Sequence, residues 1–261
     1  MNIPLYQIDA FTDTVFSGNP AAICPLEKWL PAELMQRIAL ENNLSETAFF
    51  VRNGDVFDIR WFSPTIEIDL CGHATLASAF VLYNFLGYSE PTVRFSSKSG
   101  ALNVRPDGEL LVMDFPAWPP APTDAPPFLV EALGRTPTEV LRHRDYVAVF
   151  AAEDDIRALT PNMDGLMNLD AQGVIVTAPG DAVDFVSRYF APGAGVAEDP
   201  VTGSAHSMLT PYWAERLGKT KLHARQLSAR GGEIFCEHLG ERVNIAGRAV
   251  AYMTGEIRLQ D

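Results

Sequence analysis

The sequence predicts an α+β fold built from two similar halves, in which strands wrap around one apolar helix in each half. The first observation is an apolar segment at residues 76–86, interrupted only by Ser78 and Asn84. A helix that is apolar on nearly every face is expected to be buried, because a surface helix needs a polar side. The second observation is a proline-rich stretch near the middle of the chain, and the third is a repeat of the first half in the second.

In the first half of the chain we predict a strand, a helix and two further strands before the apolar helix, and three strands after it. Pro31 opens a helical pattern through residue 43, at a first-turn position that tolerates proline. Gly87 supplies a stop signal just past the apolar helix. Residues 17–20 are typical of a turn, and the predicted strands span residues 3–11, 44–51, 56–62, 92–97, 101–105 and 109–115.

Residues 116–127 contain six prolines in twelve residues, so they cannot form a helix interior or a central strand. We therefore predict a linker here, between an N-terminal lobe at residues 1–115 and a C-terminal lobe at residues 128–261. The last strand is free to return to the N-terminal lobe. In the second lobe we predict helical segments near residues 128–133 and 154–159, a helix after Gly203, and strands at residues 146–151, 173–178 and 182–190 and near the C-terminus.

The two halves resemble each other at a nearly fixed offset. Glycines bracket the first apolar helix at residues 72–87 and the second helix at residues 203–218, and both positions are shifted by 131. Upstream, residues 60–64 are echoed by residues 188–192 at an offset of 128. Because such a series indicates duplication, we expect two lobes related by a pseudo-twofold axis. The two helix N-termini would then face each other across the cleft between the lobes, where small-molecule sites tend to form.

Composition and charge argue against several classes of protein. The formal net charge of −13 opposes nucleic-acid binding, and we interpret the short basic cluster at residues 142–144 as a solvated face. No apolar run approaches the roughly 18 residues of a membrane span and no secretory signal is visible, so we expect no membrane partner and a cytoplasmic location. Three widely spaced cysteines, Cys24, Cys71 and Cys236, argue against a disulfide framework and a cysteine-based zinc site.

The first turns of the two apolar helices are predicted anion sites. Free backbone N–H groups and the positive end of the helix dipole favour a negatively charged ligand there, and small residues let that ligand approach. A small carboxylate-bearing metabolite is the kind of partner that fits. The candidate substrate-binding residues are Gly72, Ala74, Gly203 and Ser204.

Polar side chains at these two turns have a structural and a functional interpretation. The helix dipole is expected to lower the pKa of His73 and favour a neutral imidazole that can pass a proton, whereas the alternative is a hydrogen-bonded core histidine. Asp199, Thr202 and Ser204 either contact substrate or cap the second helix. His206 lies a turn inside its helix and is interpreted as structural.

Glu46 is the remaining candidate, at the start of an apolar strand. A buried carboxylate is costly unless it is paired, and burial favours its protonated form, which suits proton transfer. The alternative is a glutamate at the rim of the strand. Its counterpart in the second half, at the offset of 128, is Val174, so that half supplies no matching acid.

Metal and cofactor signals are missing from the sequence. His73, His206, Asp199 and Glu198 lack a metal-ligand spacing such as HExxH. The chain also has no GxGxxG, P-loop or GxSxG motif, which removes the usual signals for dinucleotides, ATP and α/β-hydrolases. We therefore expect neither a metal nor a cofactor.

Four motifs together resemble the PhzF-like family, which is named for phenazine biosynthesis and is related in fold to diaminopimelate epimerase. They occur in the family's order and cover essentially the whole chain. The motifs are Ser-Gly-Asn-Pro-Ala-Ala at residues 17–22, Ser-Glu-Thr-Ala at 45–48, Cys-Gly-His-Ala-Thr at 71–75 and Glu-Asp-Pro-Val-Thr-Gly-Ser at 198–204.

The resemblance implies two lobes, each a barrel-like, mostly antiparallel sheet around a central helix, and a homodimer. It also implies an isomerase without a cofactor. In the phenazine enzyme a dihydro-hydroxyanthranilate undergoes a proton shift, and the glutamate that moves the proton corresponds to Glu46. The residues that hold and polarise the substrate correspond to His73, Asp199 and Ser204.

The expected function is a proton shift on a small carboxylate-bearing metabolite, with Glu46, His73 and Asp199 as catalytic residues. One rival is an epimerase or racemase, since the diaminopimelate epimerase relatives use two facing cysteines. Here Cys71 precedes the first helix, but residues 200–203 contain no thiol, so we interpret Cys71 as a small packing residue. The other rival is a non-catalytic protein that binds a metabolite on the same fold.

Overall fold

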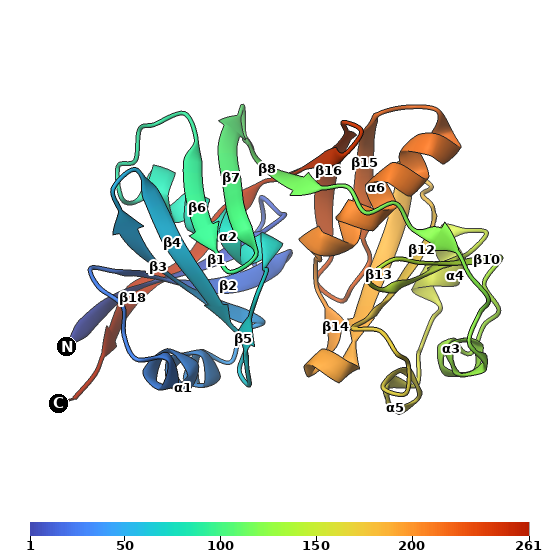
Figure 1. The fold of residues 1–261 in the computed structure, drawn as a ribbon, viewed down its shortest axis with the longest axis horizontal. Helices are drawn as coiled ribbons and strands as arrows, with labels where there is room; N and C mark the ends of the chain where they lie inside the picture. Colours follow the sequence, from blue (N-terminus) through green and yellow to red (C-terminus); the bar gives the residue numbers. More distant parts are fainter. Residues whose placement is uncertain (261) are drawn as a thin grey trace. The chain divides into compact units, whose positions relative to one another are not determined.

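The computed structural model describes residues 1–260, and the chain divides into two compact units. The first unit contains Met1–Asp114 together with the C-terminal residues from Ala246 onward, and the second contains Phe115–Ile245. Both units combine strands with one long helix, so the predicted α+β class is confirmed (Figure 1). The two ends of the chain lie together in the first unit, where the Met1 amino group donates to the Leu259 carbonyl at 2.8 Å.

The first unit wraps its strands around helix α2. This helix contacts β1, β2, β3, β7 and β18, and ten of its thirteen residues are buried, as its apolar sequence predicts. The elements are β1 (Asn2–Ala10), β2 (Asn19–Leu26), α1 (Ala32–Asn42), β3 (Glu46–Asn53), β4 (Val56–Phe62), β5 (Glu67–Ile68), α2 (Gly72–Asn84), β6 (Val93–Ser97), β7 (Gly100–Asp107), β8 (Leu110–Pro116) and β18 (Ala249–Arg258).

The second unit packs its strands against helix α6. Trp213 on this helix stacks on Phe185 and donates its indole N–H to Thr177 Oγ1 at 3.0 Å. The elements are β9 (Ala121–Pro122), α3 (Pro127–Leu133), β10 (Glu139–Arg142), β11 (Tyr146–Val149), α4 (Glu153–Arg157), α5 (Met163–Leu166), β12 (Val174–Pro179), β13 (Phe185–Ala191), the 3₁₀ turn η1 (Pro192–Ala194), β14 (Val196–Asp199), α6 (Gly203–Leu217), β15 (Lys221–Gln226), β16 (Gly232–His238) and β17 (Arg242–Gly247).

The strand pairing of one unit repeats in the other. Strands β2 and β3 pair in parallel, as β11 and β12 do, and each second strand then pairs antiparallel with the next, β4 or β13. In turn β4 pairs in parallel with β6 and β13 pairs in parallel with β15, before the antiparallel pairs β6–β7 and β15–β16. The duplication predicted from the sequence is therefore visible in the topology. Helices α2 and α6 both begin at the predicted offset of 131, at Gly72 and Gly203.

Five strands were not predicted: β2, β10 and the short strands β5, β9 and β14. Strand β2 follows the turn-like residues 17–18 directly and contains two prolines, which disfavour a strand between two neighbours, yet it pairs with β1 on one side and β3 on the other. Strand β10 is short and ends inside the basic cluster. The proline-rich residues 116–127 belong to the second unit, where Ala117 N–H donates to the Glu241 carbonyl and Trp118 N–H to the Ser207 carbonyl, both at 2.9 Å.

Candidate active site

Helices α2 and α6 both begin without a side-chain cap among residues 1–260. Cys71 and Thr202 occupy the N-cap positions, but neither side chain accepts a hydrogen bond from the first turn. The interpretation of the second turn as a capped helix start is therefore wrong for Thr202, whose hydroxyl instead donates to Asp199 Oδ2. Backbone N–H groups at a helix start of this kind can bind an anion. Gly72 and Gly203 stand at these positions, as the sequence predicts.

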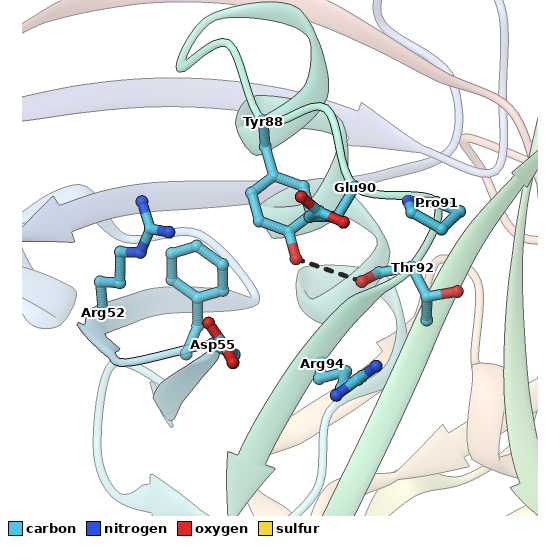
Figure 2. Close-up of a pocket in the computed structure, with 8 residues that line it drawn as sticks. Arg52, Asp55, Tyr88, Glu90, Pro91, Thr92 and Arg94 are labelled. Carbon is cyan, nitrogen blue, oxygen red and sulfur yellow. Dashed lines mark hydrogen bonds between the residues drawn. The ribbon is translucent and has the colours of Figure 1, made fainter.

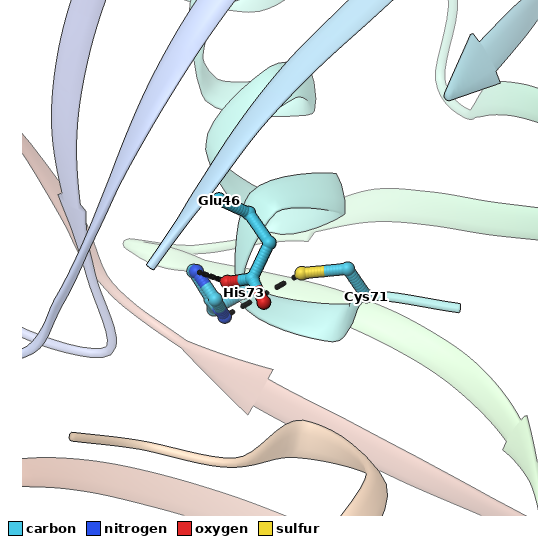
Figure 3. A group of neighbouring side chains, drawn as sticks. All are labelled: Glu46, Cys71 and His73. Carbon is cyan, nitrogen blue, oxygen red and sulfur yellow. Dashed lines mark hydrogen bonds and ion pairs between the residues drawn. The ribbon is translucent and has the colours of Figure 1, made fainter. Parts of the chain in front are cut away.

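In the first unit Glu46, Cys71 and His73 form one cluster (Figure 3). Glu46 is the first residue of β3, and His73 is the second residue of α2. His73 Nε2 lies 3.1 Å from Glu46 Oε2, and the two side chains are 4% and 13% exposed. Cys71 Sγ lies 3.6 Å from His73 Nδ1. Glu46 is therefore a nearly buried carboxylate that pairs with His73 beside the start of α2, and it is not an isolated residue at the rim of the strand.

The environment of this cluster raises the pKa of His73. Burial lowers its pKa, but Cys71 and Glu46 raise it, and the net value lies well above 6.5. Burial and Glu46 also raise the pKa of the Cys71 thiol to about 11, so this group is a neutral thiol at pH 7. The Glu46 carboxylate is therefore the main charged partner of His73. The neutral imidazole expected from the helix dipole is thus a wrong prediction, since a carboxylate at 3.1 Å outweighs a partial charge.

Asn19 belongs to the same cluster and was not predicted as a site residue. Its amide Nδ2 lies 3.1 Å from His73 Nδ1. The preceding Gly18 has a φ of +66°, and a Cβ there would lie 2.2 Å from the Ala10 carbonyl oxygen. Only glycine therefore allows the turn that delivers Asn19. The signal was present in the Ser-Gly-Asn-Pro motif, but the motif does not say where Asn19 points.

The predicted residues of the second unit also lie near one another at the start of α6. Gln226 connects Asp199 to Thr202, because its Nε2 donates to the Asp199 carbonyl at 2.7 Å and its Oε1 accepts from Thr202 N–H at 2.9 Å. Ser204 is the second residue of the helix, the same position that His73 has in α2. His206 is fully buried and contacts the Thr202 carbonyl at 2.8 Å through Nδ1, which agrees with the structural role expected for it.

The basic cluster at residues 142–144 is not a uniformly solvated face. His143 is exposed, but Arg144 is only 30% exposed and pairs with the fully buried carboxylate of Asp145. Arg144 Nη2 also donates to Ser204 Oγ at 3.2 Å. The prediction was wrong for Arg144 because the partner Asp145 enters the core, which the short basic run does not reveal.

The pKa values of the two buried histidines should be shifted in opposite directions. Glu46 keeps His73 protonated at pH 7, whereas burial lowers the pKa of His206 to about 4 and keeps it neutral. Nitrogen-detected NMR of the imidazoles should show both nitrogens of His73 protonated at pH 7 and one nitrogen of His206 protonated. In Glu46→Gln the His73 pKa should fall, because its carboxylate partner is gone. A neutral His73 at pH 6.5 in the wild type would contradict the ion pair.

The sign of the linked stability follows from these shifts. The pKa of His73 is higher in the folded state than in the unfolded state. Its contribution to the free energy of unfolding is therefore complete below pH 6.5 and is lost as the pH rises through the folded-state pKa. The pKa of His206 is lower in the folded state, so its contribution is present above pH 6.5 and is lost as the pH falls toward about 4. Urea unfolding across pH in the wild type and in Glu46→Gln separates the two, since only the His73 component depends on Glu46.

The Glu46 cluster also contains the donor types of a metal site. One ligand atom from each of Glu46, Cys71 and His73 lies within 4.8 Å of the others, and oxygen, sulfur and nitrogen donors suit zinc. Binding would require loss of protons from the thiol and from His73, both of which the present arrangement keeps protonated. The expectation of no metal therefore stays a prediction.

A separate hollow of about 340 Å³ lies on the first unit, away from these residues (Figure 2). Its lining includes Arg52, Arg94 and the ring of Tyr88, whose hydroxyl donates to the Thr92 carbonyl at 3.2 Å. Both signs of charge occur there, since Glu90 also lines it. The predicted site residues are not among its lining residues, so its position does not bear on the cluster.

Comparison with known proteins gives the family. The family model for the phenazine biosynthesis-like protein, PhzC-PhzF, matches residues 8–255. The chain belongs to this family. An uncharacterized isomerase of Pseudomonas aeruginosa is 54% identical over 260 residues, which cover 99% of this chain and 100% of the relative. A second uncharacterized isomerase, from Halalkalibacterium halodurans, is 43% identical over 99% of this chain and 100% of its own.

Solved structures agree with the family assignment. The crystal structure of a PhzF family protein from Enterococcus faecalis superimposes with a TM-score of 0.97 at 50% identity and covers 99% of this chain and 100% of its own. A hydroxyproline epimerase from Agrobacterium vitis matches with a TM-score of 0.66 at 11% identity, over 100% of this chain and 93% of its own, which shows the shared fold alone. Family membership and the names of these relatives place the chain among the isomerases.

Within residues 1–260, no helix combines the length and the apolar character that a membrane-crossing helix needs.

Proposed function

We propose that this protein is a cofactor-independent isomerase that shifts a proton within a small carboxylate-bearing metabolite, with Glu46 as the acid and base. The observation that carries the proposal is the Glu46–His73 pair, which lies at the uncapped N-terminus of α2. The reacting part of the substrate would lie beside Glu46 at the first turn of α2. A homodimer in the cytoplasm is part of the same proposal.

The proposed reaction needs one base and no added reactant. Glu46 removes a proton from a carbon of the substrate, and the electron pair enters the conjugated system of the substrate and shifts a double bond. The protonated Glu46 then returns the proton to another carbon, so that the product is an isomer and the enzyme is unchanged. His73, whose Nε2 lies 3.1 Å from Glu46 Oε2, orients this carboxylate toward the substrate.

Asp199, Gly203 and Ser204 are proposed to hold and polarise the substrate from the second unit, with Gly72 and Ala74 contributing backbone groups from the first. A proton shift by one base is favoured over inversion by two bases because the two halves differ at the position of Glu46. Phe62 pairs with Thr47 in the first unit, and its counterpart Phe190 pairs with Val174 in the second. Gly173 therefore stands at the position of Glu46, and the second unit has no equivalent acid. Inversion by two opposed bases would need one.

An epimerase or racemase is the second candidate, and Cys71 is the observation that favours it. The thiol lies 3.6 Å from the His73 ring, which could accept its proton only after losing its own. Because burial and Glu46 raise the pKa of this thiol to about 11, Cys71 is a poor base at neutral pH. Residues 200–203 also supply no second thiol.

The test is turnover of a panel of small cyclic and amino acids, beginning with a dihydro-hydroxyanthranilate, followed by NMR. The proposal expects a product of the same mass in which a hydrogen has moved to another carbon. Inversion at one carbon would support the epimerase instead, and binding without turnover of any panel member would support a non-catalytic binding protein.

Removal of metals should leave this activity unchanged. Dialysis against EDTA takes away an adventitious cation at Glu46, Cys71 and His73 without altering the ion pair between Glu46 and His73. We expect equal kcat before and after dialysis, with elemental analysis to verify that no metal remains. A loss of activity that zinc restores would contradict the metal-free mechanism.

A further inference from the structure

Arg144 and Ser204 in the second unit repeat a contact of the first unit. Ala21 pairs with Glu46 in the parallel ladder of β2 and β3, and Tyr146 pairs with Val174 in the equivalent ladder of β11 and β12. The residue two places before each ladder position is Asn19 in one unit and Arg144 in the other. Asn19 contacts His73 at 3.1 Å, and Arg144 contacts Ser204 at 3.2 Å.

The helix partners in these two contacts are equivalent as well. His73 is the second residue of α2 and Ser204 is the second residue of α6, at the offset of 131. In both units, therefore, a side chain at or just before the start of the first strand of the ladder contacts the second residue of the helix. In one unit this contact supports the residue beside the proton carrier Glu46. In the other it brings a fixed positive charge to the first turn of α6.

The contact also decides how the Ser204 hydroxyl can be used. A serine hydroxyl has one O–H donor and two acceptor lone pairs. Arg144 Nη2 has no lone pair to offer, so it donates and Ser204 Oγ accepts. Within residues 1–260 the Ser204 O–H has no acceptor of its own. Its proton is therefore available to a ligand acceptor, next to the backbone N–H groups of an uncapped helix start.

The Arg144 guanidinium is held in place before any ligand binds. Asp145 Oδ2 accepts from Arg144 Nε at 3.0 Å and from Nη2 at 2.6 Å. Asp145 is itself fixed, because Gly173 N–H donates to Oδ1 at 3.1 Å and the Tyr189 hydroxyl donates to Oδ2 at 3.3 Å. The ring of Trp118 lies 5.3 Å from the guanidinium carbon. Such a group acts on a ligand without the entropy cost of ordering a free arginine.

We propose that Arg144 is a positioning residue for the substrate carboxylate, which it directs to the first turn of α6 through the Ser204 hydroxyl and its own positive charge. This inference rests on the proposed function and adds to it the side chains that recognise the carboxylate.

The test is binding of sodium benzoate and of the neutral isostere benzamide, read from the backbone amide NMR signals of Gly203 and Ser204. In the wild type, benzoate should shift both signals and benzamide should not. Arg144→Met should weaken benzoate binding at these signals by about tenfold or more, which is the size of one charge-assisted hydrogen bond. Arg142→Met is the matched control, because Arg142 pairs with the exposed Asp170 and should leave the affinity unchanged.

Two further variants separate positioning from folding. Arg144→Lys keeps the charge and should recover part of the benzoate affinity, which a purely structural role would not predict. Arg144→Gln combined with Asp145→Asn removes both charges, leaves no buried carboxylate unpaired, and should bind benzoate as weakly as Arg144→Met. Equal benzoate affinity in the wild type and in this double variant would overturn the proposal, as would equal shifts by benzamide. Because binding is measured without turnover, a failure of the isomerase proposal remains a separate result.

Discussion

Glu46→Gln should lower kcat by about 10²- to 10⁴-fold, the usual contribution of a general acid and base. Glutamine keeps the length and the hydrogen-bonding shape of the side chain at the start of β3, but it cannot accept a proton from carbon. The fold should persist, since glutamine fills the same space beside His73 as glutamate does. Steady-state kinetics on a substrate found in the NMR panel measures the effect.

Glu41→Gln is the matched control for this variant. Glu41 lies on the exposed side of α1, five residues away in the sequence, and should tolerate the same chemical change without loss of kcat. Undiminished kcat in Glu46→Gln would remove Glu46 from the mechanism. A fall of equal size in both variants would point to a general effect on the first unit instead.

Asp145→Ala should cause the largest loss of stability among the residues near the two helix starts. Asp145 is fully buried and accepts hydrogen bonds from Arg144, from Gly173 N–H and from the Tyr189 hydroxyl. Its removal leaves a partly buried arginine without its partner, and breaking such a pair costs about 3 kcal/mol or more. A chain of this size should then unfold at a temperature lower by roughly 10 °C.

Asp170→Ala provides the comparison in the same unit. Asp170 is 71% exposed and pairs with Arg142 at the surface, so its loss should leave the melting temperature almost unchanged. Thermal unfolding followed by circular dichroism measures both variants. Equal melting temperatures in Asp145→Ala and the wild type would mean that Asp145 does not hold Arg144 in place, and would weaken the argument for Arg144.

Sequence patterns predicted those features that depend on local order along the chain. The apolar run at residues 76–86 gave a buried helix because apolar side chains on every face leave no side for water, and α2 is buried along most of its length. The repeated glycines at residues 72 and 203 marked two equivalent helix starts, which the strand pairing confirms. The motif around Glu46 placed it at the beginning of a strand, as observed.

Features that depend on partners distant in the sequence could not be predicted. The charge of His73 is set by Glu46, 27 residues earlier in the chain, and not by its own helix. Arg144 looked like part of a solvated cluster because its contact with Ser204 spans 60 residues. The similarity between the Arg144–Ser204 contact and the Asn19–His73 contact was also hidden, because each joins residues that are more than 50 positions apart in the sequence.

The central claim is that one carboxylate, Glu46, moves a proton from one carbon of the substrate to another. The most direct measurement uses substrate deuterated at the donor carbon and follows the label by NMR in ordinary water, in the wild type and in Glu46→Gln. The account predicts that the wild type removes deuterium from the donor carbon, places hydrogen or deuterium on a different carbon, and shows a slower rate than with unlabelled substrate. Glu46→Gln should suppress all three. Replacement of deuterium by solvent hydrogen at the same carbon with inverted configuration, or label transfer that persists in Glu46→Gln, would contradict it.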